Sequence, residues 1–419
     1  MVIPAGSVLV FSLNFAPEPT GIAPYVSALV RGLASRRTNL AVLTAHPHYP
    51  DWKITPGYGQ WSRSEQIDGV SVSRLRHFVP SQPSPLPRAL SEVTFGIRQS
   101  FARWGRPASI VALSPALLSS ALVRLRSRLT HRSTPFVVWV QDLYGIGISE
   151  TGQGGGLAAR IIRNVEGWLL RSASTVVVIH DRFADRVHDD FGVPRERIAV
   201  IRNWTHLPPL PPADVAAVRA LHGWSSDEVV VVHTGNMGVK QGLHHVVDAG
   251  RLAHERGENV RFVLVGNGSQ RDELQQRVDS EPTTTELLPP LGDRDFTDML
   301  QAADILLVNE LPGVAEMAVP SKLTSYFAAG RPVLAATDST GITAQEVRAA
   351  SAGLVVAAGD PAALLAGVSS LISDRAHADQ MGHNGKRYRE TVLDETFAID
   401  RFDSLLADLI AAAAEKHPA

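Results

Sequence analysis

The chain has 419 residues, of which 44% are hydrophobic and 20% charged, and a formal net charge of −2. This composition is typical of a soluble globular protein, and the length predicts two domains with a large core in each. The absence of cysteine excludes disulfides and Cys-ligated zinc. No apolar run is as long as a membrane span, and the start of the chain does not resemble a signal peptide, so we expect a cytoplasmic protein.

Apolar, strand-like runs alternate with helical patterns through the first half of the chain. The expected strands lie at residues 8–13, 40–44, 109–113, 136–140, 175–179 and 198–201, and the clearest helices at 23–35, 86–104 and 157–172. This alternation predicts a parallel sheet with helices on both faces. Ligands of such sheets bind beyond the carboxyl ends of the strands, so the loops that follow the strands are the places to search for a site.

Two of these loops carry candidate residues. Gly21 lies in the Pro- and Gly-rich loop after the first strand and precedes the first helix, where its amide can reach a phosphate; a turn glycine is the alternative. Glu18, in the same loop, is interpreted as a solvated side chain. Asp142 follows the strand 136–140, where an active-site carboxylate and a helix N-cap are both open interpretations.

Histidines near other strand ends are weaker candidates. His180 is placed to line a ligand pocket, whereas Asp181 is expected to cap the next helix. His46 and His48 are interpreted as loop residues rather than metal ligands, because no third ligand is suggested.

A Pro-dense segment at residues 205–213 predicts a semi-rigid linker. The alternating pattern then starts again, which predicts a second doubly wound domain. Its expected strands lie at 229–233, 260–265, 285–288, 305–308, 333–336 and 353–356, and a last helix is expected at about 397–414.

A glycine-rich turn follows the first strand of this second half. Gly235, Gly238 and Gly242 permit tight turns and a close approach of the backbone to a ligand, and Lys240 lies between them. The turn matches neither a Walker A loop nor a Gly-x-Gly-x-x-Gly fingerprint. We interpret Lys240 as a diphosphate contact, with an exposed surface lysine as the alternative.

The segment at residues 319–335 reads as a loop, a helix, a turn and a buried strand. Ser321 is a good N-cap candidate, and Lys322 adds a positive charge at the helix N-terminus. This arrangement predicts an anion site, most naturally for a phosphate or diphosphate, although an ordinary α/β crossover has the same local pattern.

Several of these segments together resemble a known family. They are Gly235…Lys240-x-Gly242, Val263-Leu-Val-Gly-x-Gly268, Pro320-Ser-Lys-Leu…Ala329-Gly-Arg-Pro-Val333, Phe15-Ala-Pro-Glu-Pro-Thr-Gly-Ile22 and Trp139-Val-Gln-Asp-Leu143. This set is similar to the retaining glycosyltransferases of family 4, and its Pro-Ser-Lys-Leu version to the colanic-acid and O-antigen branch. The resemblance covers nearly the whole chain.

The resemblance implies the α/β GT-B fold, in which two doubly wound Rossmann-like domains face each other across a cleft. Residues 1–204 would form the acceptor-side domain, 205–213 the linker, and 214–394 the nucleotide-sugar-binding domain. Residues 395–419 would form a C-terminal helix that packs back on the first domain.

The resemblance also implies a set of site residues. The catalytic candidates are Lys240, Lys322, Asp142 and Glu316. The donor-binding candidates are Gly21, Gly235, Asn236, Gly266, Gly268, Leu288, Pro320, Ser321 and Ser325. The Glu-x7-Glu motif of the wider family is altered here, because its two positions hold Met317 and Ser325; Glu316 takes the first role if the register shifts by one residue.

The reaction implied is transfer of a hexose from a nucleotide-diphosphate sugar, UDP rather than GDP, to a hydroxyl of a lipid-linked glycan in cell-envelope polysaccharide synthesis. No cofactor and no metal are expected, and nucleic acid is not an expected partner. Three alternatives stay open: glycosylation of a soluble small molecule or natural product, a nucleotide-sugar-binding pseudo-enzyme, and a sugar-nucleotide epimerase relative.

The region between residues 86 and 172 is unusually basic. It contains eleven arginines and four acidic residues, an excess of seven positive charges. Within it, Leu86–Arg106 and Ser119–Arg132 combine apolar residues with clustered arginines. Basic amphipathic segments of this kind lie on anionic bilayers, so we expect a peripheral contact at the inner face of the plasma membrane. The solvated face of ordinary crossover helices is the alternative.

Overall fold

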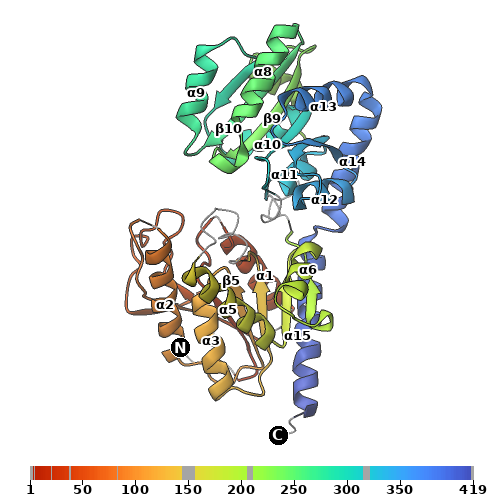
Figure 1. The fold of residues 1–419 in the computed structure, drawn as a ribbon. Helices are drawn as coiled ribbons and strands as arrows, with labels where there is room; N and C mark the ends of the chain where they lie inside the picture. Colours follow the sequence, from red (N-terminus) through yellow and green to blue (C-terminus); the bar gives the residue numbers. More distant parts are fainter. Residues whose placement is uncertain are drawn as a thin grey trace. The chain divides into compact units, whose positions relative to one another are not determined.

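The computed structural model describes residues 3, 5–19, 21–36, 39–82, 84–143, 156–204, 211–314 and 321–416, without the side chain of Ser321. The chain divides into two units (Figure 1): Met1–His206 with Glu395–Ala419, and Leu207–Asp394. None of the described helices combines the length and the apolar character needed to cross a bilayer.

The first unit is built on an eight-stranded sheet with the order β3-β4-β2-β1-β5-β6-β7-β8. The strands are β1 (Val8–Ser12), β2 (Leu40–Ala45), β3 (Ser62–Ile67), β4 (Val70–Leu75), β5 (Ser109–Ser114), β6 (Phe136–Val140), β7 (Thr175–Val178) and β8 (Ile198–Val200). All neighbours are parallel except β3 and β4, which form an antiparallel hairpin. The sequence reading missed this hairpin, because β3 is Ser-Arg-Ser-Glu-Gln-Ile and has no buried residue.

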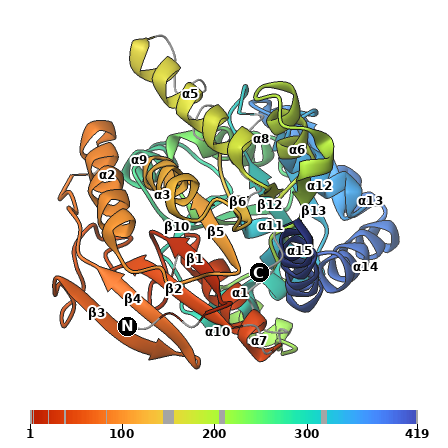
Figure 2. The ribbon, with the colours of Figure 1, turned by 90° about the horizontal axis from the view of Figure 1, so that it is seen from below.

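The helices of this unit are α1 (Ala23–Ser35), α2 (Pro85–Phe101), α3 (Leu117–Thr130), α5 (Leu157–Ser172), α6 (Asp181–Asp189) and α15 (Glu395–Lys416). Helix α15, the last of the chain, packs beside α1 (Figure 2). Phe402 of α15 is fully buried, with its ring centroid 4.9 Å from that of Trp139. A side chain at Gly32 of α1 would collide with Ile399, since an ideal Cβ would lie 2.3 Å from Ile399 Cδ1. The last helix is therefore part of the core of the first unit.

The second unit is built on a six-stranded parallel sheet with the order β11-β10-β9-β12-β13-β14. Its strands are β9 (Val229–Asn236), β10 (Val260–Asn267), β11 (Thr285–Leu288), β12 (Ile305–Asn309), β13 (Val333–Thr337) and β14 (Gly353–Ala357). Its helices are α7 (Val215–Leu221), α8 (His244–Arg256), α9 (Arg271–Ser280), α10 (Asp293–Ala302), α11 (Ser321–Ala329), α12 (Ile342–Ala349), α13 (Pro361–Ser373) and α14 (Arg375–Thr391). Buried side chains form one cluster on each face of this sheet.

Each sheet has one point at which the chain changes its direction of travel across the sheet. In the first unit it lies between β1 and β5, and in the second between β9 and β12. Open α/β sheets bind ligands in the crevice beyond the carboxyl ends of the strands at such a point. The two edges are therefore the places where functional groups are expected to gather.

Candidate functional site

In the second unit a lysine and a histidine meet at the point between β9 and β12. Nζ of Lys322 lies 3.2 Å from Nε2 of His233, and Nδ1 of His233 lies 3.0 Å from the carbonyl oxygen of Leu307. Because a carbonyl only accepts hydrogen bonds, Nδ1 carries the ring proton and Nε2 accepts from the ammonium. Burial, together with the charge of Lys322, holds the pKa of His233 well below its usual value, so the ring is neutral.

The Lys322 ammonium is partly buried, and this changes its acidity. Burial lowers the pKa of Lys322 to about 8, while the charge of Glu310 acts in the opposite direction. Glu310 follows β12 and accepts hydrogen bonds from the hydroxyls of Thr337 and, at 2.7 Å, Thr343. Burial makes the charged form of this lysine less stable, and the lysine lies beside the end of β9. A lysine in such a position is a candidate for binding an anion.

Lys322 and the glycine-rich turn lie side by side. An ideal Cβ built on Gly235 would be 3.7 Å from Cε and 3.8 Å from Nζ of Lys322, and the φ of Gly235 is +117°. Gly235 and Asn236 are exposed at the end of β9. The structure thus brings the two segments that the sequence marks as anion sites to one edge of the sheet.

Tyr326 fixes this arrangement, and sequence reasoning missed it. Its buried hydroxyl accepts from the N–H of Thr234 at 2.9 Å and donates to the carbonyl of Leu307 at 3.2 Å, so it joins α11 to β9 and β12. Lys322 is four residues earlier, which is one turn of the same helix. The available signal was a tyrosine at i+4 from the lysine, on the apolar face of a short helix.

Residues at the end of β12 and just after it hold the turn that contains Lys240. Asn309 Nδ2 donates to the carbonyls of Gln241 at 2.7 Å and Gly242 at 3.1 Å, and the N–H of Leu311 donates to the Lys240 carbonyl at 2.9 Å. In the described part of the chain the Lys240 ammonium, which is partly exposed, has no ion pair or hydrogen bond. Its role as a diphosphate contact stays a prediction.

Gly266 and Gly268 have a packing role that is independent of any ligand. An ideal Cβ on Gly266 would lie 1.9 Å from the Gly235 carbonyl oxygen, and one on Gly268 would lie 2.6 Å from the Asn236 side-chain oxygen. Arg271 then ties the ends of two strands together, because it donates to the carbonyls of Gly266 at 2.9 Å and Leu288 at 3.0 Å. Leu288 and the two glycines remain donor-binding predictions.

Other predicted residues of this site are only partly described. Glu316 and Pro320 lie outside the described residues, and Ser321 begins α11 without a described side chain. Ser325 is partly buried on the same helix. The roles assigned to Glu316 and Ser325 in the altered Glu-x7-Glu motif therefore stay predictions.

The first unit has a cavity of about 160 Å³ at its own crossing point. It is lined by Leu13 and Asn14 after β1, Gly21 and Ile22 at the start of α1, Pro115 and Ala116 after β5, and His48, Tyr49, Trp52, Arg88, Ser91 and Glu92. Gly21 has a φ of +68°, and a Cβ there would lie 3.3 Å from the Tyr49 ring. The loop after β1 thus faces this cavity.

The interpretation of Glu18 as a solvated side chain is wrong. It is 6% exposed, and its carboxylate accepts from the N–H groups of Phe15 at 3.2 Å, His48 at 2.8 Å and Tyr49 at 2.9 Å and from Nδ2 of Asn14 at 2.9 Å. Glu18 therefore joins the loops after β1 and β2, which both line the cavity. Only the meeting of these loops reveals the role, because a Pro-rich loop gives no sign of burial.

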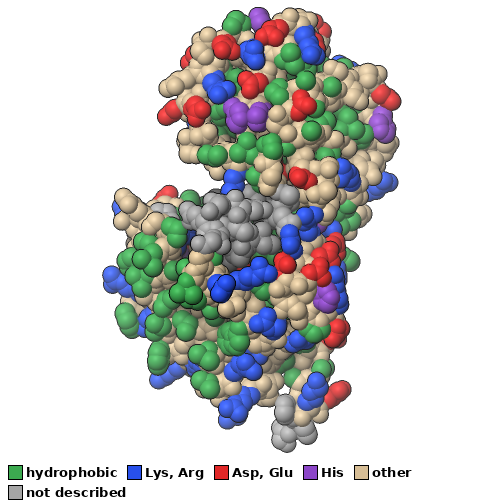
Figure 3. All heavy atoms as spheres, in the orientation of Figure 1, with side chains coloured by type: hydrophobic (Ala, Val, Ile, Leu, Met, Phe, Trp, Pro, Cys, Tyr) green, Lys and Arg blue, Asp and Glu red, His purple; other side chains and the backbone are tan. Residues whose placement is uncertain are grey.

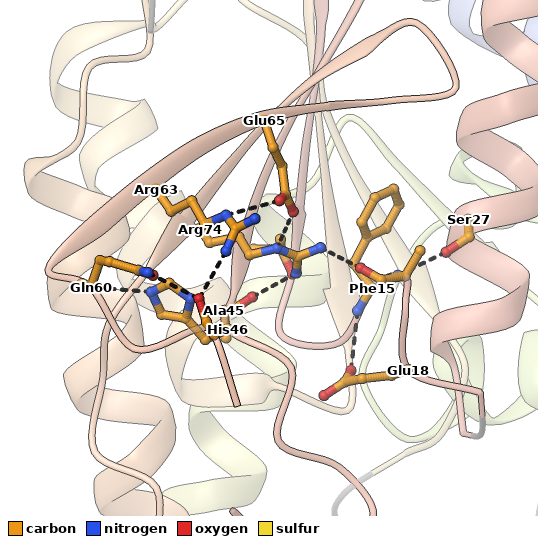
Figure 4. Close-up of polar contacts among 12 residues, drawn as sticks. Phe15, Glu18, Ser27, Ala45, His46, Gln60, Arg63, Glu65 and Arg74 are labelled. Carbon is orange, nitrogen blue, oxygen red and sulfur yellow. Dashed lines mark hydrogen bonds and ion pairs between the residues drawn. The ribbon is translucent and has the colours of Figure 1, made fainter. Parts of the chain in front are cut away.

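A second buried charge supports the same loops (Figure 4). Arg74 of β4 is fully buried, donates to the carbonyls of Ala45 at 3.1 Å and Ala16, and pairs with Glu65 of β3. The Ala16 N–H donates to Ser27 Oγ of α1 at 3.0 Å. The missed hairpin thus anchors the cavity loops to the sheet.

The capping role expected of Asp181 belongs to His180. His180 is buried and caps α6, because its Nδ1 accepts the Arg182 N–H at 3.0 Å, and Asp181 is the first residue of the helix. Burial lowers the pKa of His180 to about 4, which keeps Nδ1 free to accept. Asp142 is exposed at the end of β6, and its carbonyl accepts from Ser114 Oγ at 2.9 Å; its catalytic role stays a prediction.

His46 and His48 lie in the loop after β2, and both are buried. Over the residues that the structure describes, no group of three or more His, Asp or Glu side chains is arranged to hold a metal ion.

Comparison with known proteins agrees with this architecture. Residues 20–204 match the family described as "Glycosyl transferase 4-like domain", and residues 214–388 match "Glycosyl transferases group 1". The chain is 30% identical over 338 residues, 77% of this chain and 81% of the relative, to WcaI of Escherichia coli (strain K12), named as a glycosyl transferase of colanic acid biosynthesis.

Two solved structures share the fold over nearly the whole chain. Sucrose-phosphate synthase from Thermosynechococcus elongatus has a TM-score of 0.71 at 18% identity and covers 97% of this chain and 100% of its own. Anabaena HepE, solved with UDP-glucose, has a TM-score of 0.65 at 16% identity and covers 97% and 99%.

The two α/β units with their separate parallel sheets define a protein of the GT-B fold class. The chain belongs to glycosyltransferase family 4, the glycosyl transferases group 1, with a GT4-like N-terminal domain. It is an enzyme of class EC 2.4, in a family whose members retain the anomeric configuration of the transferred sugar.

Proposed function

We propose that the enzyme transfers a sugar from a UDP-sugar to a hydroxyl of a lipid-linked glycan in cell-envelope polysaccharide synthesis. The observation that carries the donor half is the Lys322 ammonium beside Gly235, at the crossing point of the second sheet. UDP-glucose bound to HepE and the colanic acid pathway of WcaI support the donor and the acceptor class respectively.

The proposed reaction needs no carboxylate pair in the protein. The bond between the sugar C1 and the diphosphate oxygen breaks, and the acceptor oxygen bonds to C1 on the same face. The acceptor proton passes to the leaving diphosphate. The protein then has to hold the two substrates in place and stabilise the charge that develops on the diphosphate.

Three groups are assigned to the diphosphate in this proposal: the Lys322 ammonium, the Lys240 ammonium, and the exposed backbone at Gly235 and Asn236. His233 is a positioning residue, because its neutral Nε2 accepts one N–H of Lys322 and leaves the others for the ligand. Two lysines supply the positive charge that a metal ion supplies in other transferases, so we propose a metal-independent reaction.

The test is incubation of the purified enzyme with UDP- and GDP-sugars and a polyprenyl-diphosphate glycan, with EDTA present. The expected result is release of UDP together with a product whose mass is increased by one sugar. A product on a soluble acceptor alone would favour the small-molecule alternative. Nucleotide-sugar binding without any product would favour the pseudo-enzyme, and conversion of the donor sugar without transfer would favour an epimerase.

A membrane contact through the first unit is part of this proposal. Helices α2, α3 and α5 are neighbours and expose large apolar side chains, among them Phe101 (86%), Leu129 (65%) and Leu157 (75%). Their only acidic residues, Glu92 and Glu166, are both buried. Figure 3 shows hydrophobic and basic side chains gathered over these helices.

This surface, which we call the α2–α3–α5 surface, suits an anionic bilayer. The exposed arginines on it and beside it are Arg88, Arg103, Arg106, Arg128, Arg132, Arg160, Arg163 and Arg171. Each basic residue near an anionic membrane contributes about 1 kcal/mol of binding, which falls with salt. Apolar side chains that enter the headgroup region add to this attraction.

Vesicle flotation tests the membrane contact. The full chain is expected to float with phosphatidylglycerol vesicles at low salt, to float less at high salt, and to stay behind with phosphatidylcholine alone. Phe101→Ser with Leu129→Ser should weaken flotation, whereas Leu221→Ser, which changes an 80% exposed leucine of α7 in the second unit, should not. Equal loss in both variants, or no flotation at low salt, would contradict the membrane contact.

A further inference from the structure

The cavity of the first unit contains a buried hydroxyl that the protein itself does not satisfy. Ser91 lines the cavity and is 2% exposed, and its hydroxyl has no hydrogen-bond partner among the described residues. A buried hydroxyl without a partner is costly. A hydroxyl-bearing ligand would satisfy it.

The His48 ring, which lines the cavity, is held in a fixed orientation. Its Nδ1 lies 2.9 Å from the His46 carbonyl oxygen and donates to it, so Nε2 is the ring nitrogen left for another partner. Glu18 holds the backbone of this residue, and its carboxylate oxygen is 3.5 Å from Nδ1. The Glu92 carboxylate also lines the cavity, with one oxygen accepting the Leu118 N–H at 2.9 Å.

Arg88 supplies a positive charge at the same cavity. Its guanidinium lies over the Trp52 ring, 5.5 Å from the centroid, and it forms no ion pair within the described part of the chain. The Trp52 ring in turn packs edge-on against His48 at 5.9 Å and Tyr49 at 6.2 Å between centroids. A cation–π contact on a packed indole limits the freedom of the guanidinium and leaves its N–H groups available to a ligand.

The same cavity therefore offers groups that can hydrogen-bond to sugar hydroxyls and one arginine that can bind an anionic group. A neutral sugar would use Ser91, His48 and Glu92 and leave Arg88 without a role. A simple anion would use Arg88 and leave the Ser91 hydroxyl without a partner. A sugar that carries a carboxylate or a phosphate uses both sets.

We infer that this cavity binds an anionic sugar, a hexuronate or a sugar phosphate, as the acceptor residue. The inference rests on the proposed transferase function, because it names the class of acceptor that would receive the sugar. Arg88 is then the specificity-determining residue, with Trp52 as its positioning residue. The planar, forked guanidinium pairs with either a carboxylate or a phosphate through two parallel hydrogen bonds.

Saturation-transfer NMR and calorimetry on the full chain test the inference, with D-glucuronate, glucose 1-phosphate and D-glucose as probes. At least one anionic sugar is expected to bind about tenfold or more tightly than glucose, since hydrogen bonds to charged groups contribute more than neutral ones. The two anionic probes separate a carboxylate acceptor from a phosphate acceptor.

Variants assign the effect to Arg88. Arg88→Gln should weaken the anionic sugar about tenfold or more and leave glucose unchanged, and Arg88→Lys should recover part of the loss. The matched control is Arg103→Gln, which changes an exposed arginine that does not line the cavity. Ser91→Ala should weaken charged and neutral sugars alike. UDP binding is measured in every variant and should not change.

Anionic sugars that bind no better than glucose, or that bind Arg88→Gln as tightly as the unaltered chain, would overturn the inference. The UDP measurement separates this outcome from failure of the proposed function. If UDP binds and a neutral glycan is glycosylated, only the anionic acceptor is wrong. If UDP does not bind, the donor proposal is wrong, whereas the sugar titrations still report on the cavity.

Discussion

Replacement of Lys322 by methionine separates the functional role of this lysine from any structural one. The side chain keeps its length and apolar stem but loses the ammonium that lies 3.2 Å from His233 Nε2. If the ammonium binds the donor diphosphate, turnover should fall about 10²–10³-fold, which is typical when one group that stabilises a developing charge is removed. The folded protein, however, should be no less stable.

The stability expectation follows from the pKa. Burial lowers the pKa of Lys322 from 10.5 to about 8, so keeping it charged in the folded protein at neutral pH costs about 3 kcal/mol at 1.36 kcal/mol per pKa unit. Methionine removes this cost but leaves the buried His233 Nε2 without a donor, which costs about 1–3 kcal/mol. The two effects oppose each other, and the net change lies between about zero and 2 kcal/mol in favour of the variant.

The pH dependence of unfolding has a definite sign. Between the folded pKa of about 8 and the unfolded value of 10.5, the unfolded chain binds the proton and the folded chain does not, so stability rises with pH in this window. From pH 7 to 9.5 the unaltered chain should gain about 2 kcal/mol relative to Lys322→Met. For a unit of this size the gain is about 4–8 °C in Tm. In parallel, kcat/KM for the donor should fall above about pH 8 as the ammonium loses its proton.

The assay is a pair of thermal unfolding curves at each pH, together with initial rates of UDP release. A variant with near-normal kcat/KM would place the diphosphate away from Lys322. A stability difference that does not change between pH 7 and 9.5 would show that the ammonium is not buried as described. A variant that loses both activity and several kcal/mol of stability would make the lysine structural.

Three further expectations concern the packing that supports the two sites, and each is checked by thermal unfolding. Gly266→Ala would place a Cβ 1.9 Å from a carbonyl oxygen of the next strand and should destabilise the second unit by more than about 3 kcal/mol, whereas Gly292→Ala, with nothing within 4 Å, should not. Glu18→Gln replaces a buried carboxylate that accepts three backbone N–H groups and should cost about 1–3 kcal/mol. Phe402→Ala should cost about 3–5 kcal/mol, because the ring is fully buried, and Phe397→Ala, which is 52% exposed, should cost far less. A small effect at any of the three buried positions would contradict the packing described for it.

The sequence predicts most of the parallel strands because most of the buried strands are continuous apolar runs. The segment Val229–His233, for example, begins β9 and is entirely buried. The hairpin of β3 and β4 could not be predicted in this way, since the polar β3 is held by pairing with β4 and not by burial. The burial of Glu18 and Arg74 was hidden for a related reason: their partners are backbone groups of loops that come together only in the folded unit.

The nearness of Lys322 to Gly235 was predictable in kind but not in detail. Gly235 lies at the carboxyl end of β9, and Lys322 lies at the start of the helix that follows β12. Strand ends, and the N-termini of the helices that follow them, share one edge of a parallel sheet. Strands β10 and β11 fill one side of β9, so β12 has to pair on the other side, and the helix that follows β12 lies at the crossing point. The detail depends on two buried side chains with distant partners. Neutral His233, which contacts Lys322, bonds to Leu307, 74 residues away, and the Tyr326 hydroxyl, which fixes the position of α11, bonds to Thr234, 92 residues away.

The site in the second unit combines a lysine whose charge is costly to bury with a helix that is bonded to the neighbouring strands. Tyr326 joins α11 to two strands, and Gly266 allows β10 to approach β9 where a side chain would not fit. A lysine on a mobile loop would avoid the burial cost by moving into solvent; on α11 it stays beside Gly235. An anionic ligand that enters there offsets part of the cost, raises the pKa of Lys322 and takes up a proton when it binds above about pH 8. Proton uptake on UDP binding, measured by calorimetry in buffers of different ionisation enthalpy at pH 8.5, should therefore be present in the unaltered chain and lost in Lys322→Met.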